Sequence, residues 1–299
     1  ILGGNLFNFF RLRKYIHKEN IIFSELHIFR HLKPALQVFS LNIVTSIYLQ
    51  LSPVLLGFMK DALAVGYFTA ATKIMQMLLK MSSCLGAVMM PRASNLIAEN
   101  KDEVFSRLIQ KSYDFTLAIS MPITVGLIVC APSLIRVLCG DSFEDSIFSS
   151  QIIAPVILMV AISNVLGIQV LFPKGKINLV TLCCTIGAVV DLLLNLCLIP
   201  AFSYVGTSIA YLGAEVATTF SMYIIGRKYI PLTYFKKNHI IYFVGSLVMA
   251  MALLGVQQLQ VSNLLMLIIQ GCIGFLVYFI ILCVCKDTML IQLLSKFKR

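Results

Sequence analysis

Long runs of apolar residues dominate the chain. Asp, Glu, Lys and Arg are absent from residues 34–59, 115–135, 146–173 and 238–285. Each run reaches the roughly 20 residues that a helix needs to cross the hydrocarbon core of a bilayer. The last run is long enough for two crossings, with three glutamines marking a polar turn near its middle. A membrane β-barrel would instead alternate apolar and polar residues, so the pattern predicts helices.

Weaker apolar segments fill the gaps between these runs. We therefore expect an all-α polytopic membrane protein with about eight transmembrane helices, at residues 35–59, 65–90, 114–137, 150–172, 179–199, 206–226, 240–257 and 263–285. Composition supports this prediction. Hydrophobic residues make up 59% of the 299 residues and charged residues 12%, whereas soluble domains carry about 25% charged residues.

Basic residues alternate between the two sides of this topology. Twenty of the 24 Lys and Arg residues fall in segments 1–34, 91–111, 174–176, 227–237 and 286–299. Cytoplasmic loops of membrane proteins carry an excess of such residues, so the pattern predicts that both chain ends are cytoplasmic. It also accounts for the net charge of +11, because the basic residues are spread over five short segments, and no nucleic-acid partner is expected.

The first residues resemble the cytoplasmic end of a helix whose beginning is missing, which suggests a fragment of a longer transporter. Ile1–Phe10 is apolar and is followed at once by Arg11 and Arg13. Residues 21–33 are expected to form an amphipathic interfacial helix, and residues 99–111 repeat its pattern. The predicted organisation is a linker over residues 1–34, a transmembrane region over 35–226, and two additional helices with a basic tail over 227–299.

Polar residues form stripes on two neighbouring predicted helices. Lys73 and Lys80 are spaced so that they share a helix face with Thr69, Gln76 and Ser83, and the preceding helix carries Asn42, Ser46 and Gln50. Charges within a span usually face a cavity or a partner, so we expect a hydrated cavity lined by Lys73, Lys80, Gln76, Asn42 and Gln50. The alternative is hydrogen bonding between helices, with Lys73 extending toward the interface.

Asp191 and Glu215 lie within later spans, each the same number of residues from Ser203 in the connecting turn. They are therefore expected at similar depth. Three interpretations are open: an ion pair with Lys73, a proton or sodium site for ion coupling, or neutral hydrogen-bonded carboxyls. Desolvation favours the neutral form of a buried carboxyl. At the span edges, Asp114 is expected to be interfacial and Arg136 to pair with Asp141.

No pattern of catalytic or metal-binding residues is evident. The nine cysteines contain no CxxC, the four histidines have no ligand spacing within a span, and GxSxG, HExxH and a Gly-rich phosphate loop are all missing from the sequence. Cys in a span behaves as a small apolar residue. The sequence therefore predicts a protein without cofactor or metal that is not an enzyme.

Several segments resemble the polysaccharide-repeat-unit flippases of the multidrug/oligosaccharidyl-lipid/polysaccharide exporter superfamily. They cover nearly the whole chain in order: DALAVGYFTAATKI at 61–74, PRASNLIA at 91–98, Pro122, Leu138-Cys139-Gly140, GIQVLFPKG at 167–175 and NLCLIPAFSYVG at 195–206. Leu-Cys-Gly departs from the family's usual aromatic Leu-Phe-Gly.

The resemblance implies a six-helix C-terminal lobe plus two extra helices, with an N-terminal lobe missing. It also implies flipping of an undecaprenyl-diphosphate-linked oligosaccharide across the bacterial inner membrane, for an O-antigen or capsule, by alternating access. Arg11, Arg13 and Arg30 would collect the diphosphate at the cytoplasmic face. Membrane lipids are expected partners, as are the polymerase and glycosyltransferases of the same pathway.

Two other functions remain open at this point. A multidrug or cation exporter of the same superfamily should have a site lined by acids and aromatics rather than by two lysines. A membrane-bound glycosyltransferase or polymerase should have a large outer loop or a cytoplasmic catalytic domain, and the sequence contains neither.

Overall fold

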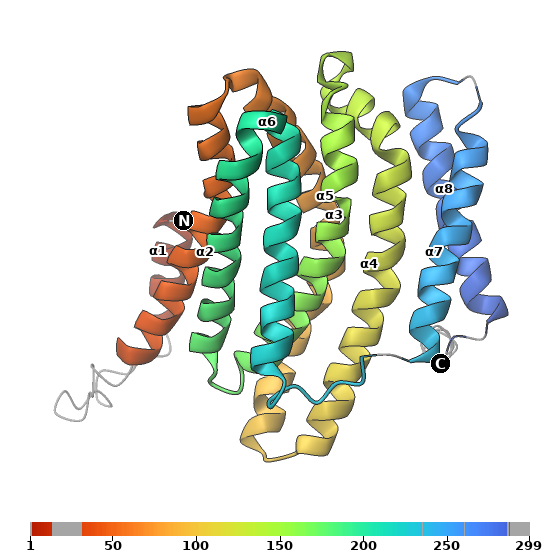
Figure 1. Ribbon diagram of the computed structural model, residues 1–299. Helices are drawn as coiled ribbons and strands as arrows, with labels where there is room; N and C mark the ends of the chain where they lie inside the picture. Colours follow the sequence, from red (N-terminus) through yellow and green to blue (C-terminus); the bar gives the residue numbers. More distant parts are fainter. Residues whose placement is uncertain (1, 14–31, 235, 260, 286, 288–299) are drawn as a thin grey trace. The chain divides into compact units, whose positions relative to one another are not determined.

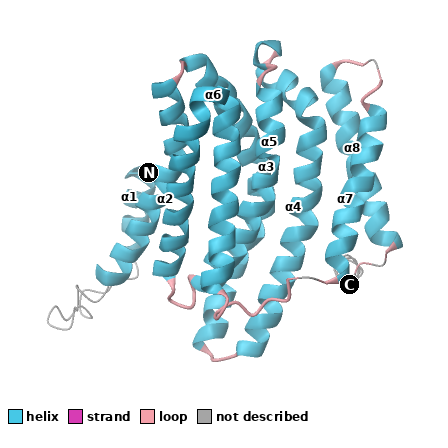
Figure 2. Ribbon diagram, viewed as in Figure 1, coloured by secondary structure: helices cyan, strands magenta, loops and turns pink. Residues whose placement is uncertain are grey.

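The computed structural model describes residues 2–13, 32–234, 236–259, 261–285 and 287. These residues form helices and loops without strands (Figure 2), which confirms the predicted all-α class. They divide into two compact units, Ile1–Ser40 and Leu41–Arg299. The first unit contains helix α1 (Leu2–Arg13) and the start of helix α2. The predicted amphipathic helix at residues 21–33 lies almost entirely outside the described residues.

The second unit is a set of long helices that run side by side (Figure 1). In chain order the elements are α2 (Leu32–Met59), α3 (Ala62–Ala98), α4 (Asp102–Cys139), the short 3₁₀ turn η4 (Asp141–Phe143), α5 (Ser146–Asn164), the π-helical segment η5 (Val165–Leu171), α6 (Ile177–Gly226), α7 (Lys237–Val256) and α8 (Asn263–Val284). Of the described helices, seven are long and apolar enough to cross a membrane.

Helix α6 is a hairpin of two arms that reverses at Ser203, where the backbone φ is 51° (Figure 1). Close approaches between the arms pair Gly206 with Leu198, Gly213 with Leu194, and Gly187 with Thr218. The two residues of each pair lie at similar distances in sequence from Ser203, one on each arm, as expected for two antiparallel helices. Counting both arms, the described helices make eight crossings, which confirms the predicted number and the predicted turn.

The turns gather at two opposite ends of this unit (Figure 1). Residues 60–61, 140–145 and 200–204 form one end, where Lys60 Nζ donates to the Pro200 carbonyl at 3.0 Å. This end carries Asp61, Asp141, Glu144 and Asp145 and is called the acidic end below. Residues 99–101, 172–176 and 227–236 form the other, where Lys174 Nζ donates to the Tyr229 carbonyl at 2.9 Å. It is called the basic end.

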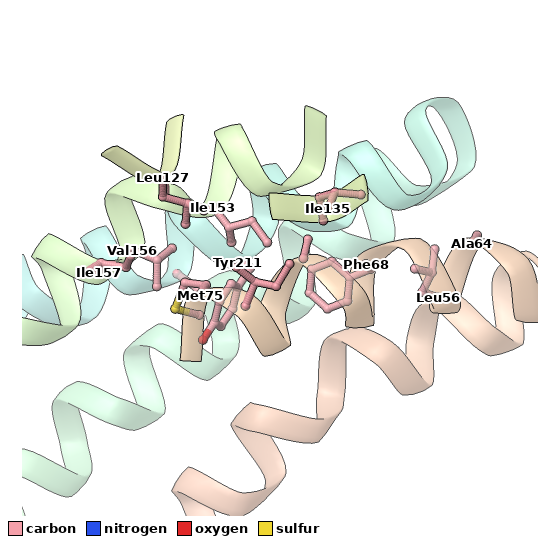
Figure 3. Packing of buried hydrophobic residues seen from close by; sticks show 14 of the residues in the cluster. Leu56, Ala64, Phe68, Met75, Leu127, Ile135, Ile153, Val156, Ile157 and Tyr211 are labelled. Atoms are coloured by element: carbon pink, nitrogen blue, oxygen red, sulfur yellow. The ribbon is translucent and has the colours of Figure 1, made fainter. Parts of the chain in front are cut away.

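The apolar core lies where α3, α4, α5 and both arms of α6 meet. Tyr211 is central to it, with Phe68 edge-on at 6.2 Å between ring centroids and Met75 beside it (Figure 3). Leu127, Ile153 and Ile157 complete the packing and are at most 1% exposed. Because α6 closes against α3 and α5 through these contacts, residues on the inner faces of α2 and α6 are held away from lipid and water.

Two expected boundaries were wrong. Residues 102–111 do not form a separate interfacial helix, because they are the first turns of α4 and bury Phe105 and Ile109. The span expected to begin at residue 65 begins at Ala62, where the Asp61 carboxylate caps the helix by accepting from the Ala64 N–H at 2.7 Å. In both cases the helix continues past its apolar run, through the buried side chains in the first turns of α4 and up to the Asp61 cap of α3.

We expect Gly206→Ala to destabilise the α6 hairpin. A Cβ at this position would lie 2.5 Å from the Leu198 carbonyl oxygen, and backbone of the opposite arm cannot yield as a flexible side chain can. Overpacking of this kind costs about 1–3 kcal/mol, so the purified protein should unfold at a lower temperature. Gly255→Ala is the matched control, since nothing lies within 4 Å of its Cβ position. Equal melting temperatures for the two variants would contradict the hairpin register.

Candidate functional site

A buried polar cluster joins α2 to the first arm of α6. Ser52 Oγ lies 3.0 Å and 2.9 Å from the two carboxylate oxygens of Asp191, so its single proton is shared between them. Asn195 Nδ2 donates to Ser52 Oγ at 3.0 Å and to the Asp191 carbonyl at 2.9 Å. Asp191 and Asn195 are fully buried. The Asn195 Oδ1 atom has no hydrogen-bond partner among the described residues.

The second arm of α6 brings Glu215 to the same region. Glu215 is 5% exposed and interacts with the Tyr48 hydroxyl of α2 and with the Asp191 carboxyl. The Tyr48 hydroxyl is buried and reaches no described group at normal hydrogen-bond geometry. Tyr211, one turn before Glu215, stacks obliquely against Tyr48 at 6.3 Å between ring centroids. The predicted similar depth of the two carboxyls follows directly from the hairpin register.

An ion pair with Lys73, one of the three interpretations left open for these carboxyls, is not found among the described residues. Lys73 takes part in none of the ion pairs among described residues, and its side chain is exposed. The physical reason is the side of α3 from which Lys73 extends. Helix α3 buries Ala64, Phe68 and Met75, and at about 3.6 residues per turn Lys73 lies on roughly the opposite side of the helix. The two carboxyls are thus surrounded by neutral partners, an arrangement that suits a bound proton or a small cation.

The polar stripe of α3 faces away from the described helices. Lys73 and Lys80 are exposed on one side of α3 and Gln76 between them is half-buried. On α2, Asn42 and Gln50 are also exposed, on a different side from Tyr48 and Ser52, which are buried. The structure therefore brings none of these five residues into the carboxyl cluster.

The three arginines expected at a diphosphate entrance fall elsewhere. Arg11 is exposed on α1, with its guanidinium over the Phe7 ring at 5.9 Å. Arg13 ends α1, and Arg30 lies outside the described residues. Arg11 and Arg13 belong to the first compact unit.

An apolar cavity of about 750 Å³ lies between α3 and α4 on one side and α7 and α8 on the other. Its walls include Met81, Phe115, Leu253 and Phe279. Gln270 is an exception in this lining: it is 1% exposed and neither its amide oxygen nor its amide nitrogen has a partner among the described residues. This cavity was not predictable from the sequence, because apolar residues that face a cavity and apolar residues that face lipid form the same pattern.

Sequence reasoning also missed a polar network at the basic end. Asp114 accepts from Lys236 Nζ and lies 3.0 Å from His239 Nε2, and His239 Nδ1 lies 3.0 Å from the Tyr234 carbonyl. His239, 6% exposed, was expected to have no particular role. The network attaches α7 to α4. At the other end, Arg136 pairs with Glu144 rather than with the expected Asp141, because η4 turns Glu144 back toward α4.

A third missed feature is the π-helical segment η5. Ser112 of α4 donates to Gln169 Oε1 at 2.6 Å, and Gln169 is 2% exposed. A Cβ at Gly86 of α3 would lie 3.0 Å from Gln169 Nε2, so the glycine provides the space that this amide occupies. Gln169 thereby joins three helices. π-Helical turns often occur at functional sites, but among the described residues no further hydrogen bond to the Gln169 side chain is found.

Comparisons with known proteins first define a class. The fold is similar to that of a solved structure titled "Lipid II flippase MurJ, inward closed conformation", with a TM-score of 0.76 and 16% identity over 97% of this chain and 61% of that one. It is also similar to an outward-facing multidrug resistance MATE family transporter of the MOP superfamily, with a TM-score of 0.59 and 16% identity over 74% and 52% of the two chains. At this level of identity the likeness shows the fold class alone.

Sequence comparisons then point to one branch of it. A family model described as "Polysaccharide biosynthesis protein" matches residues 12–148. Proteins named "Putative O-antigen transporter" are 26% identical over 64% of this chain in Escherichia coli K12, and 27% identical over 71% in Shigella dysenteriae. The chain spans about half the length of these relatives, 46% and 53%. Together the comparisons confirm the resemblance to the polysaccharide flippases of the MOP superfamily.

Proposed function

We propose that this chain is the C-terminal part of a transporter that flips an undecaprenyl-diphosphate-linked oligosaccharide across the bacterial inner membrane. The observation that carries the proposal is the pair of exposed lysines in the middle of α3, a membrane-crossing helix whose other side is fully packed. An ammonium facing lipid is costly, whereas an ammonium facing a hydrated cavity can bind a diphosphate. Relatives named O-antigen transporters support the same substrate class.

Asn42, Gln50 and Gln76 belong to the same proposed cavity as Lys73 and Lys80. Amide side chains can donate to sugar hydroxyls and phosphate oxygens and accept from hydroxyls, so they complement the lysines. The apolar cavity between α4 and α8 supplies space for part of the lipid carrier, whose long hydrocarbon chain needs an apolar environment. Arg11, Arg13 and Arg30 are proposed to attract the diphosphate before it enters. Each is a phosphate ligand by chemistry.

Ion coupling through Asp191 and Glu215 is proposed as the energy source. Two buried carboxyls that interact with each other cannot both remain ionised without a compensating charge. Their described partners, Ser52, Asn195 and Tyr48, are neutral. A proton or a sodium ion is therefore the natural occupant. Because the cluster bridges α2 and both arms of α6, its occupancy can alter how these helices pack as the transporter alternates between its two faces.

The transporter is proposed to act without enzymatic chemistry and to deliver its substrate to a polysaccharide polymerase. Glycosyltransferases of the same pathway would supply the lipid-linked oligosaccharide on the cytoplasmic side. The test is deletion of the gene in the source bacterium. We expect loss of surface polysaccharide and accumulation of the lipid-linked oligosaccharide in the cytoplasmic leaflet, both reversed by the full-length gene. Unchanged surface polysaccharide in the deletion strain would overturn the proposed function.

The basic end of the helices is proposed to be cytoplasmic. In a background without native cysteines, Ser142→Cys at the acidic end should react with an impermeant maleimide applied to intact cells, because Ser142 is exposed there. Lys101→Cys at the basic end should react only after the cells are opened. Labelling of the position 101 variant in intact cells would show that the orientation is reversed.

A further inference from the structure

Three turns meet at the acidic end and bring aromatic rings together. Tyr67 comes from the first turns of α3, Phe143 from η4, and Tyr204 from the reversal of α6. The ring centroids of Tyr67 and Tyr204 are 5.3 Å apart, and those of Tyr67 and Phe143 are 6.0 Å apart. Both contacts are edge-to-face. The Phe143 ring also lies next to Gly66, where an added Cβ would be in ordinary contact with it at 3.7 Å.

The three rings lie at the edge of the apolar core, against which Phe143 and Tyr204 pack. All three are half-buried, whereas the core rings of Phe68 and Tyr211 are buried. Part of each residue therefore stays accessible at the acidic end of the helices. Clusters that only hold turns together gain most by burying their rings completely. The accessible ring surface is available to a ligand.

A carboxylate accompanies the rings. Asp145 is exposed and interacts with the hydroxyls of both Tyr67 and Tyr204. The Asp61 carboxylate, which caps α3, is exposed beside Tyr67. A carboxylate accepts hydrogen bonds from several hydroxyls at once, and a phenol both donates and accepts. Accessible aromatic surface beside such groups suits a ligand that has apolar C–H faces edged by hydroxyls, which is the chemistry of a sugar ring.

The negative charge of the acidic end distinguishes the ring cluster from the proposed cavity, which carries two lysines. At the acidic end, Lys60 is directed to the Pro200 carbonyl and Arg136 is paired with Glu144. Asp61, Asp141 and Asp145 form none of the ion pairs found among the described residues. A diphosphate would be repelled here, while an uncharged or amino sugar would not. The two ends of a lipid-linked oligosaccharide thus match two different places on the same helix, α3.

We propose that Tyr67, Phe143 and Tyr204, with Asp145, form a sugar-binding platform that receives the oligosaccharide at the acidic end of the transporter. This inference rests on the proposed function for the identity of the substrate and on the proposed orientation for its role at the outer face. The platform holds the sugars after they cross while the lysines release the diphosphate. Its ligand class is the carbohydrate part of the substrate alone.

Direct binding tests the platform, and the chain offers a convenient reporter because it contains no tryptophan. The variant Phe143→Trp of the full-length transporter, in lipid nanodiscs and with any tryptophan outside these 299 residues replaced by phenylalanine, places a single indole in the platform. The probe is the soluble oligosaccharide that mild acid releases from the lipid carrier of the producing cells. We expect it to change the indole fluorescence with saturable binding, and we expect inorganic pyrophosphate at the same concentration to have no effect.

Two substitutions in this reporter variant separate binding from folding. Tyr204→Leu and Asp145→Asn should each weaken oligosaccharide binding by about tenfold, the size expected when one anchor of a small site is removed. Asp141→Asn, a neighbouring exposed carboxylate outside the ring contacts, is the matched control and should bind normally. All variants should keep the melting temperature of the reporter protein.

The outcomes distinguish this inference from the proposed function. If the full-length protein restores surface polysaccharide but the oligosaccharide leaves the indole unchanged, or pyrophosphate binds equally well, the platform is wrong and the flippase stands. If Phe143→Trp itself fails to fold, export by Tyr204→Leu and Tyr204→Phe in the native sequence decides. Loss of export in Tyr204→Leu with export retained in Tyr204→Phe supports the platform. Normal export by Tyr204→Leu overturns it.

Discussion

Replacement of Lys80 by glutamine is expected to abolish surface polysaccharide while leaving membrane insertion and abundance normal. Lys80 lies near the middle of α3, exposed on the side opposite to the packed face. Placing an ammonium at such a depth costs about 2.5–3.5 kcal/mol on insertion scales. Glutamine keeps the length and polarity but cannot neutralise a phosphate, so loss of export would assign the charge to the substrate.

The direction of the stability change separates a binding role from a structural one. If Lys80 faces a cavity, Lys80→Gln removes a costly charge, and the protein should unfold at the same or a higher temperature. A structural ion pair would give the opposite result. Lys80→Arg should export in part. Arginine keeps the positive charge, but a planar guanidinium replaces the compact ammonium of lysine. Lys111→Gln, an exposed lysine in the first turns of α4, is the matched control and should export normally.

Lys73→Gln should reduce export less than Lys80→Gln. The two lysines lie two turns apart, roughly 10 Å along the axis, so one diphosphate cannot contact both ammonium groups equally. The measurement is the amount of polysaccharide on intact cells, normalised to transporter abundance. Wild-type export by both glutamine variants would show that the stripe is structural and that the cavity lies elsewhere.

Much of the fold was accessible to sequence reasoning because lipid makes the apolar runs long and continuous. The number of crossings and the turn at Ser203 followed from those runs and from the polar residues between them. What apolarity cannot reveal is where a helix continues into water. The first turns of α4 were therefore mistaken for a separate helix, although Phe105 and Ile109 pack as part of the same one.

The candidate site was only partly predictable, and the reason is directional. Spacing from Ser203 places Asp191 and Glu215 at comparable depth, but depth does not fix which side of a helix faces a partner. The stripe on α2 drew attention to Asn42 and Gln50, whereas on another side of α2 Ser52 donates to the Asp191 carboxyl and Tyr48 lies near Glu215. Tyr48 and Ser52 are spaced by one helical turn, a signal that becomes meaningful only once the opposite helix is known.

Long-range contacts formed by loops were beyond sequence reasoning altogether. His239 meets Asp114 only because residues 227–236 return across the basic end to α4, where Gln110 Oε1 accepts from the Thr233 N–H at 2.8 Å. No periodicity in the chain encodes such a return. The same holds for the aromatic contacts at the acidic end, which join three turns that are far apart in the sequence.

Replacement of Asp191 by asparagine is expected to remove ion coupling and to reduce export to the level of the deletion strain. The carboxyl is fully buried between α2 and α6, and its described hydrogen-bond partner, Ser52, is neutral and is itself held by Asn195. Asparagine preserves the volume and can still accept from Ser52, so the packing of the hairpin should survive. It cannot bind or release a proton, and it contributes no charge to hold a cation. An effect on export without an effect on the melting temperature would therefore come from the lost titratable group.

The measurement is flipping of the lipid-linked oligosaccharide by the full-length protein in proteoliposomes, with either a proton or a sodium gradient imposed. The wild-type protein should respond to one of the two gradients, and Asp191→Asn should respond to neither. Asp141→Asn, an exposed carboxylate at the acidic end, should keep the wild-type response. Ser52→Ala should weaken the response without abolishing it, because it removes one neutral ligand and leaves the carboxyl in place. If Asp191→Asn keeps a gradient-dependent rate, the cluster is a neutral hydrogen-bonded element that joins α2 to α6, and the coupling ion binds elsewhere in the transporter.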